Sequence, residues 1–159
     1  MNASGSIRSL LGIALSWRDA HASFDDAVAD IPENLRGVRP SGLPYSAWQI
    51  VEHLRIAQED ILDFCRDADY QQRTWPDDYW PLSPAPPSAA AWDESISRFK
   101  ADRKQLEALA ADKSLDLGGT IPHGSGQTYL RELVLVIDHN AYHVGQLVLL
   151  RRLLGVWSA

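Results

Sequence analysis

The sequence predicts an all-α fold, an up-and-down four-helix bundle that forms one domain over residues 1–159. Four long segments carry apolar residues spaced by three and four, and none carries a sustained alternation of apolar and polar residues. Connections rich in Pro and Gly separate these segments. A chain of this length holds about one domain, and the facing helices of a bundle can build a metal or cofactor site from inward side chains.

The first helix is expected from about Ser6 to Ala29. Its apolar stripe consists of Ile7, Leu10, Leu11, Ala14, Trp17, His21, Phe24 and Val28. Because residues at this spacing share one helix face, we expect His21 to point inward, where it could accept a proton or orient another group. A hydrogen-bonded core histidine is the alternative. A connection rich in Pro and Gly follows, over residues 32–44.

The second helix is expected from Ser46 to about Arg66. Ser46 and Gln49 have the spacing of a capping box, in which each side chain bonds a free backbone N–H at the helix start. On a helical wheel, His53 and Asp60 lie along one margin of the apolar arc. His53 therefore faces a seam between helices. Asp60, two turns further on, is better placed to orient a substrate or pair with a base than to bind the same ion.

The segment of residues 67–87 is expected to be a loop, with bulky aromatics and prolines between Trp75 and Pro81. We favour a plug that fills the end of the bundle over a substrate lid, although long loops are often functional. A third helix is expected from Ser88 to Ala111, and its charged residues predict a solvated face.

The fourth helix is expected from Gln127 to Leu154, with Gly155 as its left-handed terminal residue. It has two apolar sides, and an exposed apolar face usually marks an interface. We therefore expect a homodimer through its second face. The face with the histidines comprises Glu132, Val136, His139, His143, Leu147 and Leu150, and the second comprises Leu130, Ile137, Ala141, Val144 and Val148.

Composition excludes several classes of function. The formal charge of −6 removes the general attraction to nucleic acid and to anionic membrane surfaces. The single cysteine, Cys65, permits neither an intramolecular disulfide nor a multi-cysteine zinc site, and it is expected to be a buried apolar residue. The apolar run Leu10–Leu15 is too short for a membrane span. We expect a cytoplasmic protein whose partner is a small molecule.

The fourth helix carries the strongest chemical signal. His139 and His143 lie four residues apart, so both imidazoles project from one face and can bind a single ion. His53 on the facing helix supplies a third nitrogen donor, and Gln146 continues the histidine stripe. Three ligands with an open position are typical of a catalytic site, and nitrogen donors favour zinc or nickel. Alternatively, each histidine is a hydrogen-bonded core residue. His123 lies too far along the chain for us to include it.

The second and fourth helices together resemble a known family. The segment from Ser46 to Leu54, which contains His53, and the pattern Asp138-His139-x-x-x-His143-x-x-Gln146 are similar to the DinB superfamily of metalloenzymes, which includes bacillithiol transferases and mycothiol-dependent maleylpyruvate isomerases. The resemblance covers residues 7–155. It implies a bundle that holds a divalent ion through His53, His139 and His143. Histidine at all three positions favours the transferase-like branch over the isomerases.

Three neutral imidazoles leave the charge of a divalent ion uncompensated, so a bound thiol or water loses its proton near neutral pH, which predicts thiol S-transferase-like or hydrolase-like chemistry. The resemblance favours the transfer of a thiol. A low-molecular-weight thiol would be the cosubstrate, with His21, Asp60 and Gln146 as candidate catalytic residues beside the metal ligands. The alternative is a non-catalytic, dimeric stress-response protein that binds a metal or a small ligand.

Overall fold

The computed structural model describes residues 3–16 and 20–157. Within these ranges the chain is all-α, as predicted, and one isolated bridge between Thr120 and Thr128 is its only β-type pairing. The helices are α1 (Ala3–Ala14), α2 (Phe24–Val28), α3 (Ala47–Arg66), α4 (Ala89–Ala111) and α5 (Tyr129–Leu153), with a short 3-10 turn, η1 (Glu33–Leu35).

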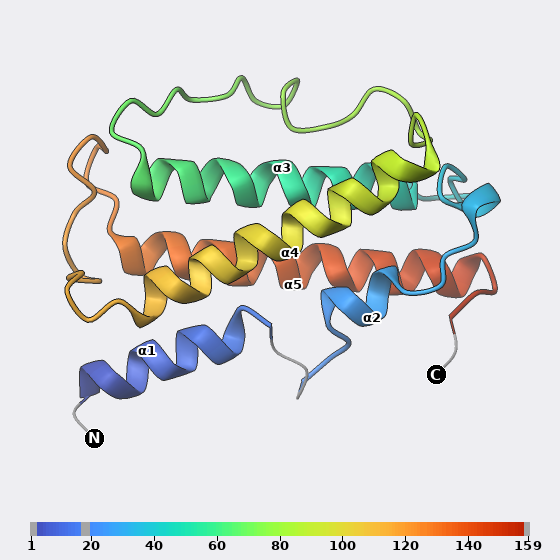
Figure 1. Cartoon of the computed structure of the whole chain (residues 1–159). Coiled ribbons are helices and arrows are strands. Elements are labelled where there is room, and N and C mark those ends of the chain that lie inside the picture. Colours follow the sequence, from blue (N-terminus) through green and yellow to red (C-terminus); the bar gives the residue numbers. More distant parts are fainter. Residues whose placement is uncertain (1–2, 17–19, 158–159) are drawn as a thin grey trace.

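Helices α3 and α5 lie side by side and run in opposite directions, and α4 crosses them obliquely (Figure 1). Helix α4 packs on α3 and α1, whereas α5 packs on α3 and α2. The long connection between α3 and α4 runs back along α3 (Figure 1). The seam between α3 and α5 therefore combines residues that are far apart in the sequence.

The starts of the three long helices are set by side chains that accept backbone N–H groups. Ser46 Oγ accepts from Gln49 N, and Gln49 Oε1 accepts from Ser46 N, which confirms the predicted capping box of α3. Ser88 and Thr128 cap α4 and α5 by accepting from the backbone N–H of Ala91 and Arg131, without a reciprocal bond. Gly155 has a φ of 72°, the left-handed conformation predicted for the end of the fourth helix.

The prediction of one long first helix is wrong. Helix α1 ends at Ala14, and a second capping box, formed by Ser23 and Asp26, begins the separate helix α2. The stripe on which His21 was placed is therefore interrupted. His21 lies outside both helices and is exposed, while Trp17, predicted on the same stripe, lies outside the described residues.

Two apolar clusters form the core. One contains residues of α2, the start of α3 and the end of α5, including Phe24, Leu54 and Leu147. The other joins α1 to the end of α4 and the start of α5, including Leu106 and Leu133. Buried polar side chains of α3 and α5 lie between them along both helices.

The second apolar face of α5 is largely covered within this fold, and the homodimer predicted through it stays a prediction. Val144 is buried, and Leu130, Ile137 and Val148 are half-buried and pack on the two core clusters. A monomer therefore already covers most of this stripe. The large exposed apolar side chains of α5 are others: Val134, Leu135, Tyr142, Leu149 and Leu153.

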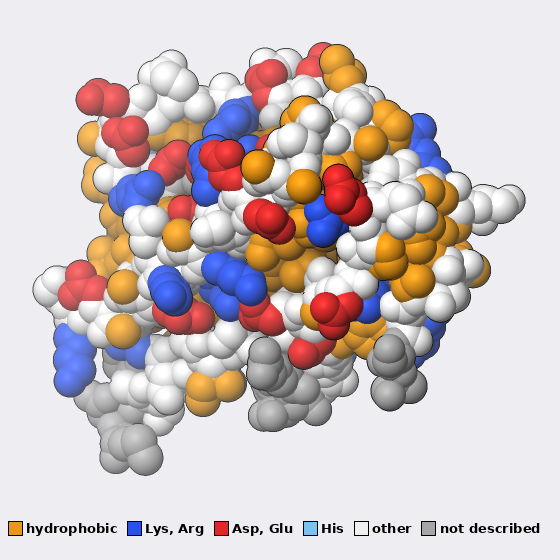
Figure 2. All heavy atoms as spheres, turned by 45° about the vertical axis from the view of Figure 1, so that its right-hand side comes forward, with side chains coloured by type: hydrophobic (Ala, Val, Ile, Leu, Met, Phe, Trp, Pro, Cys, Tyr) orange, Lys and Arg blue, Asp and Glu red, His pale blue; other side chains and the backbone are white. Residues whose placement is uncertain are grey.

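The surface in Figure 2 shows acidic and basic side chains interspersed with apolar ones. Helix α5 is long and apolar enough to pass a length and composition test for a membrane span, with a mean hydropathy of 1.3. This is weak evidence for a span, because α5 also supplies buried residues to both core clusters.

Candidate metal centre

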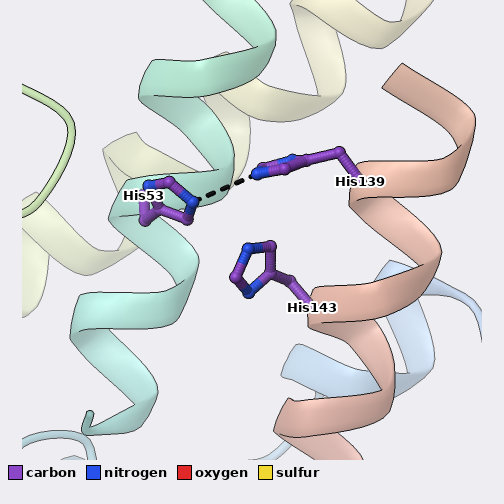
Figure 3. Close-up of side chains that lie close together, drawn as sticks. All are labelled: His53, His139 and His143. Atoms are coloured by element: carbon purple, nitrogen blue, oxygen red, sulfur yellow. Dashed lines mark hydrogen bonds between the residues drawn. The ribbon is translucent and has the colours of Figure 1, made fainter. Parts of the chain in front are cut away.

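Three histidines meet in the seam between α3 and α5. His53 comes from the second turn of α3, and His139 and His143 from successive turns of α5 (Figure 3). Each offers one ring nitrogen, and these atoms all lie within 4.8 Å of one another. His53 and His143 are buried, and His139 is half-buried. Such a group can hold a metal ion.

The spacing of the ring nitrogens suits a shared ion. Nε2 of His53 and Nε2 of His139 are 3.1 Å apart, and the two rings share a hydrogen bond (Figure 3). Two nitrogens bound to one tetrahedral ion, each at about 2.0–2.1 Å, lie about 3.3 Å from each other. The observed separation is close to this value, so these two nitrogens can share one ion.

Hydrogen bonds to oxygen acceptors orient two of the three rings. Nδ1–H of His53 donates to the carbonyl oxygen of Tyr79 at 3.0 Å, and Nδ1–H of His143 donates to Oε1 of Gln146 at 2.7 Å. A neutral imidazole carries one N–H, so these bonds leave Nε2 of both rings without a proton. Metal-ligating histidines are typically held in this manner. Gln146, predicted as a catalytic residue, therefore contacts His143.

Burial keeps the three rings neutral. Burial lowers the pKa of His53 to about 4, and the other two histidines act in the same direction. The hydrogen bond to the Tyr79 carbonyl raises this pKa but does not outweigh burial. Burial and His143 lower the pKa of His139 to about 4, and burial also lowers the pKa of His143. Neutral imidazole is the form that binds metal.

Aromatic rings form a wall of the site. Trp80 stacks on His53 with ring centroids 3.8 Å apart, and Tyr45 stacks on Trp80 at the same separation. Trp75 and Tyr142, both largely exposed, lie edge-on to His53 and His143. The connection between α3 and α4 thus covers one face of the histidine cluster. It packs along the seam between α3 and α5, and its role as a plug rather than a substrate lid stays a prediction.

Asp60 is buried two turns beyond His53 and anchors this connection. Its carboxylate accepts hydrogen bonds from the hydroxyls of Tyr70 at 3.0 Å and Tyr79 at 2.6 Å, and Nε of Arg73 lies 3.5 Å away. Burial and the carboxylate together raise the pKa of Tyr70 to about 12. Tyr79 therefore joins Asp60 to His53, through its hydroxyl at one end and its carbonyl at the other.

The remaining sequence candidates lie outside the histidine cluster. Nδ1 of His21 is 2.8 Å from the neighbouring Ala22 carbonyl, and Nε2 of His123 donates to the carbonyl of Phe64. Cys65 is 4% exposed, and burial raises its pKa to about 12, so it is the buried residue that was predicted.

Sequence reasoning missed the residues that support the ligands through backbone or long-range contacts. Tyr79 acts through its carbonyl, which leaves no signature in the sequence. Trp80 and Tyr45 come from connections, where periodicity gives no orientation. The density of aromatic residues between Trp75 and Trp80 was the one usable signal.

Comparison with known proteins agrees with this arrangement. A family model described as the DinB superfamily matches residues 16–147. The match includes all three histidines, Asp60 and Gln146. No significantly similar curated protein and no significantly similar solved structure were found. The chain belongs to the DinB superfamily.

Proposed function

We propose that this chain is a cytoplasmic, metal-dependent enzyme that transfers a low-molecular-weight thiol to an electrophile, with His53, His139 and His143 as the ligands of a zinc or nickel ion. The observation that carries the proposal is the convergence of three neutral ring nitrogens within 4.8 Å. Three protein ligands leave a coordination position for a reactant, which is the arrangement of catalytic sites. A divalent ion bound there lowers the pKa of a thiol or water toward neutrality.

Two pockets lie toward opposite ends of the seam between α3 and α5. A small apolar pocket is lined by Leu43, Pro44, Tyr45, Ile50, Gln146 and Leu149. Ile50 lies one turn before His53, and Gln146 one turn after His143. Because α3 and α5 are antiparallel, this pocket is at one end of the seam. It suits the apolar part of an electrophile.

The second pocket is polar and lies toward the other end of the seam. Its lining includes Asp60, Tyr79, Arg131 and Glu132. Asp60 follows His53 by two turns and Glu132 precedes His139 by two turns. Charged and hydroxyl groups of this kind suit a polar cosubstrate, so we assign this pocket to the body of the thiol.

The thiol must come from a small molecule, because the only cysteine of the chain is buried and protonated. In the proposed reaction, the sulfur of the cosubstrate forms a bond to the electrophilic carbon. The leaving group departs with its electron pair, and the thiol proton is released to solvent. The stack of Trp80 on His53 excludes water from that face and so disfavours competing hydrolysis.

Metal analysis and a transfer assay test the proposal. We expect near-complete loss of bound metal in His53→Ala, His139→Ala and His143→Ala, and wild-type content in the matched control His123→Ala, whose histidine lies outside the cluster.

The metal-loaded protein should consume a thiol and a halogenated electrophile in equal amounts. Electrophile consumption without thiol indicates a hydrolase, and metal binding without turnover indicates the non-catalytic alternative. Unchanged metal content in all three variants contradicts the proposal.

A further inference from the structure

A directional chain of hydrogen bonds crosses the core beside His139. Nε2 of Gln58 donates to the carbonyl oxygen of Phe99 at 2.7 Å, and Nδ2 of Asn140 donates to Oε1 of Gln58 at 3.0 Å. A backbone carbonyl can only accept, so it fixes the orientation of both amides. Oδ1 of Asn140 is consequently the acceptor at the end of the chain.

The two amides of this series of hydrogen bonds lie in the apolar interior. Gln58 is 1% exposed and Asn140 is 9% exposed. Along α3, Gln58 lies between Leu54 of one core cluster and Leu62 of the other. Burial of two amides at this position destabilises a core unless their hydrogen bonds are satisfied.

Oδ1 of Asn140 is buried and has no hydrogen-bond partner within the described residues. Buried acceptors without a partner are uncommon, and each calls for an explanation. The residue before Asn140 is His139, and the Asn140 side chain acts on that ring by opposing the effect of burial on its pKa. The two side chains are therefore neighbours in space as well as in sequence.

Within the described residues, Nδ1 of His139 has no oxygen acceptor, in contrast to Nδ1 of the other two candidate ligands. His53 and His143 each donate Nδ1–H to an oxygen, of Tyr79 and Gln146 respectively. A neutral His139 that binds an ion through Nε2 must carry its proton on Nδ1, and this N–H also requires an acceptor.

We infer that Asn140 is the positioning residue of His139: in the metal-loaded protein its Oδ1 accepts the hydrogen bond from Nδ1–H of His139, and Gln58 and the Phe99 carbonyl hold it in place. The inference rests on the proposed metal site. It gives each of the three imidazoles an oxygen acceptor, and it connects the metal centre to α4 through Phe99. It also explains why Oδ1 of Asn140 has no hydrogen-bond partner within the described residues.

The experiment compares cobalt(II) binding to wild type, Asn140→Leu and Asn140→Asp, with Leu106→Ala as a core control remote from the cluster. Asn140→Leu keeps the size of the side chain but removes the acceptor, so we expect cobalt affinity to fall about 10- to 100-fold and the visible d–d bands to shift. Asn140→Asp keeps an acceptor and should bind at least as tightly as wild type. Leu106→Ala should be less stable but have the wild-type affinity and spectrum.

Affinity and spectrum of Asn140→Leu equal to those of wild type would overturn this inference alone. An equal loss of affinity in Leu106→Ala would also overturn it, because the effect would then follow from stability. If wild type binds no cobalt, zinc or nickel, the proposed function fails and the inference fails with it.

Discussion

At the scale of single residues, the histidines combine neutrality with fixed orientation. Burial lowers the pKa of His53 and His139 to about 4, below the ordinary value of 6.5. Oxygen atoms of Tyr79 and Gln146 accept the Nδ1 protons of His53 and His143, so the unprotonated Nε2 atoms of both rings point into the seam. A site built in this way needs no proton loss before it binds metal at neutral pH.

The lowered pKa values predict an acid-sensitive metal-free protein. Between pH 6.5 and 4 the unfolded chain binds protons at His53 and His139 that the folded chain does not bind, so stability rises with pH across this window and is lost as the pH falls through it. We expect the urea midpoint of chelator-treated protein to fall between pH 7 and pH 5. The fall should be smaller in His53→Gln/His139→Gln, and an equal fall in that variant would contradict this explanation.

Cys65 should be inert in the folded protein. Its thiol is buried, and a pKa of about 12 leaves almost no thiolate at pH 8. Iodoacetamide should leave native protein unmodified over hours and label it fully in concentrated guanidinium, as mass spectrometry would show. Rapid labelling of the native state would show that Cys65 is accessible.

At the scale of elements, Asp60 holds the connection between α3 and α4 against the site. Asp60→Asn removes the charge that the hydroxyls of Tyr70 and Tyr79 and the guanidinium of Arg73 approach. We expect a loss of about 1–3 kcal/mol of stability and faster amide exchange over residues 67–88. Asp63→Asn makes the same charge change on the exposed side of α3 and should cost less than about 0.5 kcal/mol. Equal effects of the two substitutions would refute the anchoring role.

The elements also show what the sequence could predict. Capping residues and apolar spacing located α3, α4 and α5 to within two residues, and spacing of four placed His139 and His143 on one face. The first helix was predicted too long because its apolar spacing continued across the break. The Ser-x-x-Asp pattern at Ser23 and Asp26 was the signal for a new helix start.

Contacts made by loops could not be predicted in the same way. The conformation of the connection between α3 and α4 is set by tertiary contacts such as those of Tyr79 and Trp80 with His53. The sequence predicts a dimer through the second apolar face of α5, but it does not show that α5 contacts helices of its own chain on more than one side. Helix periodicity identifies an apolar face but not its partner.

At the scale of the whole molecule, the three candidate ligands join helices that are distant in the chain, so an ion bound there should stabilise the fold. A ligand at 100 times its dissociation constant adds about 2.7 kcal/mol to the free energy of unfolding. For a domain of this size we expect a rise in Tm of about 5–10 °C with zinc or nickel. The rise should be absent in His143→Ala and retained in His123→Ala, and calorimetry measures both.

The central claim is that all three imidazoles bind one ion. X-ray absorption spectroscopy of the zinc- or nickel-loaded wild-type protein tests it most directly. We predict one ion per chain with three imidazole nitrogens, at about 2.0–2.1 Å for zinc, and one or more oxygen ligands from solvent. A first shell with fewer than three imidazoles, or an ion bound at much less than one per chain, would contradict the account.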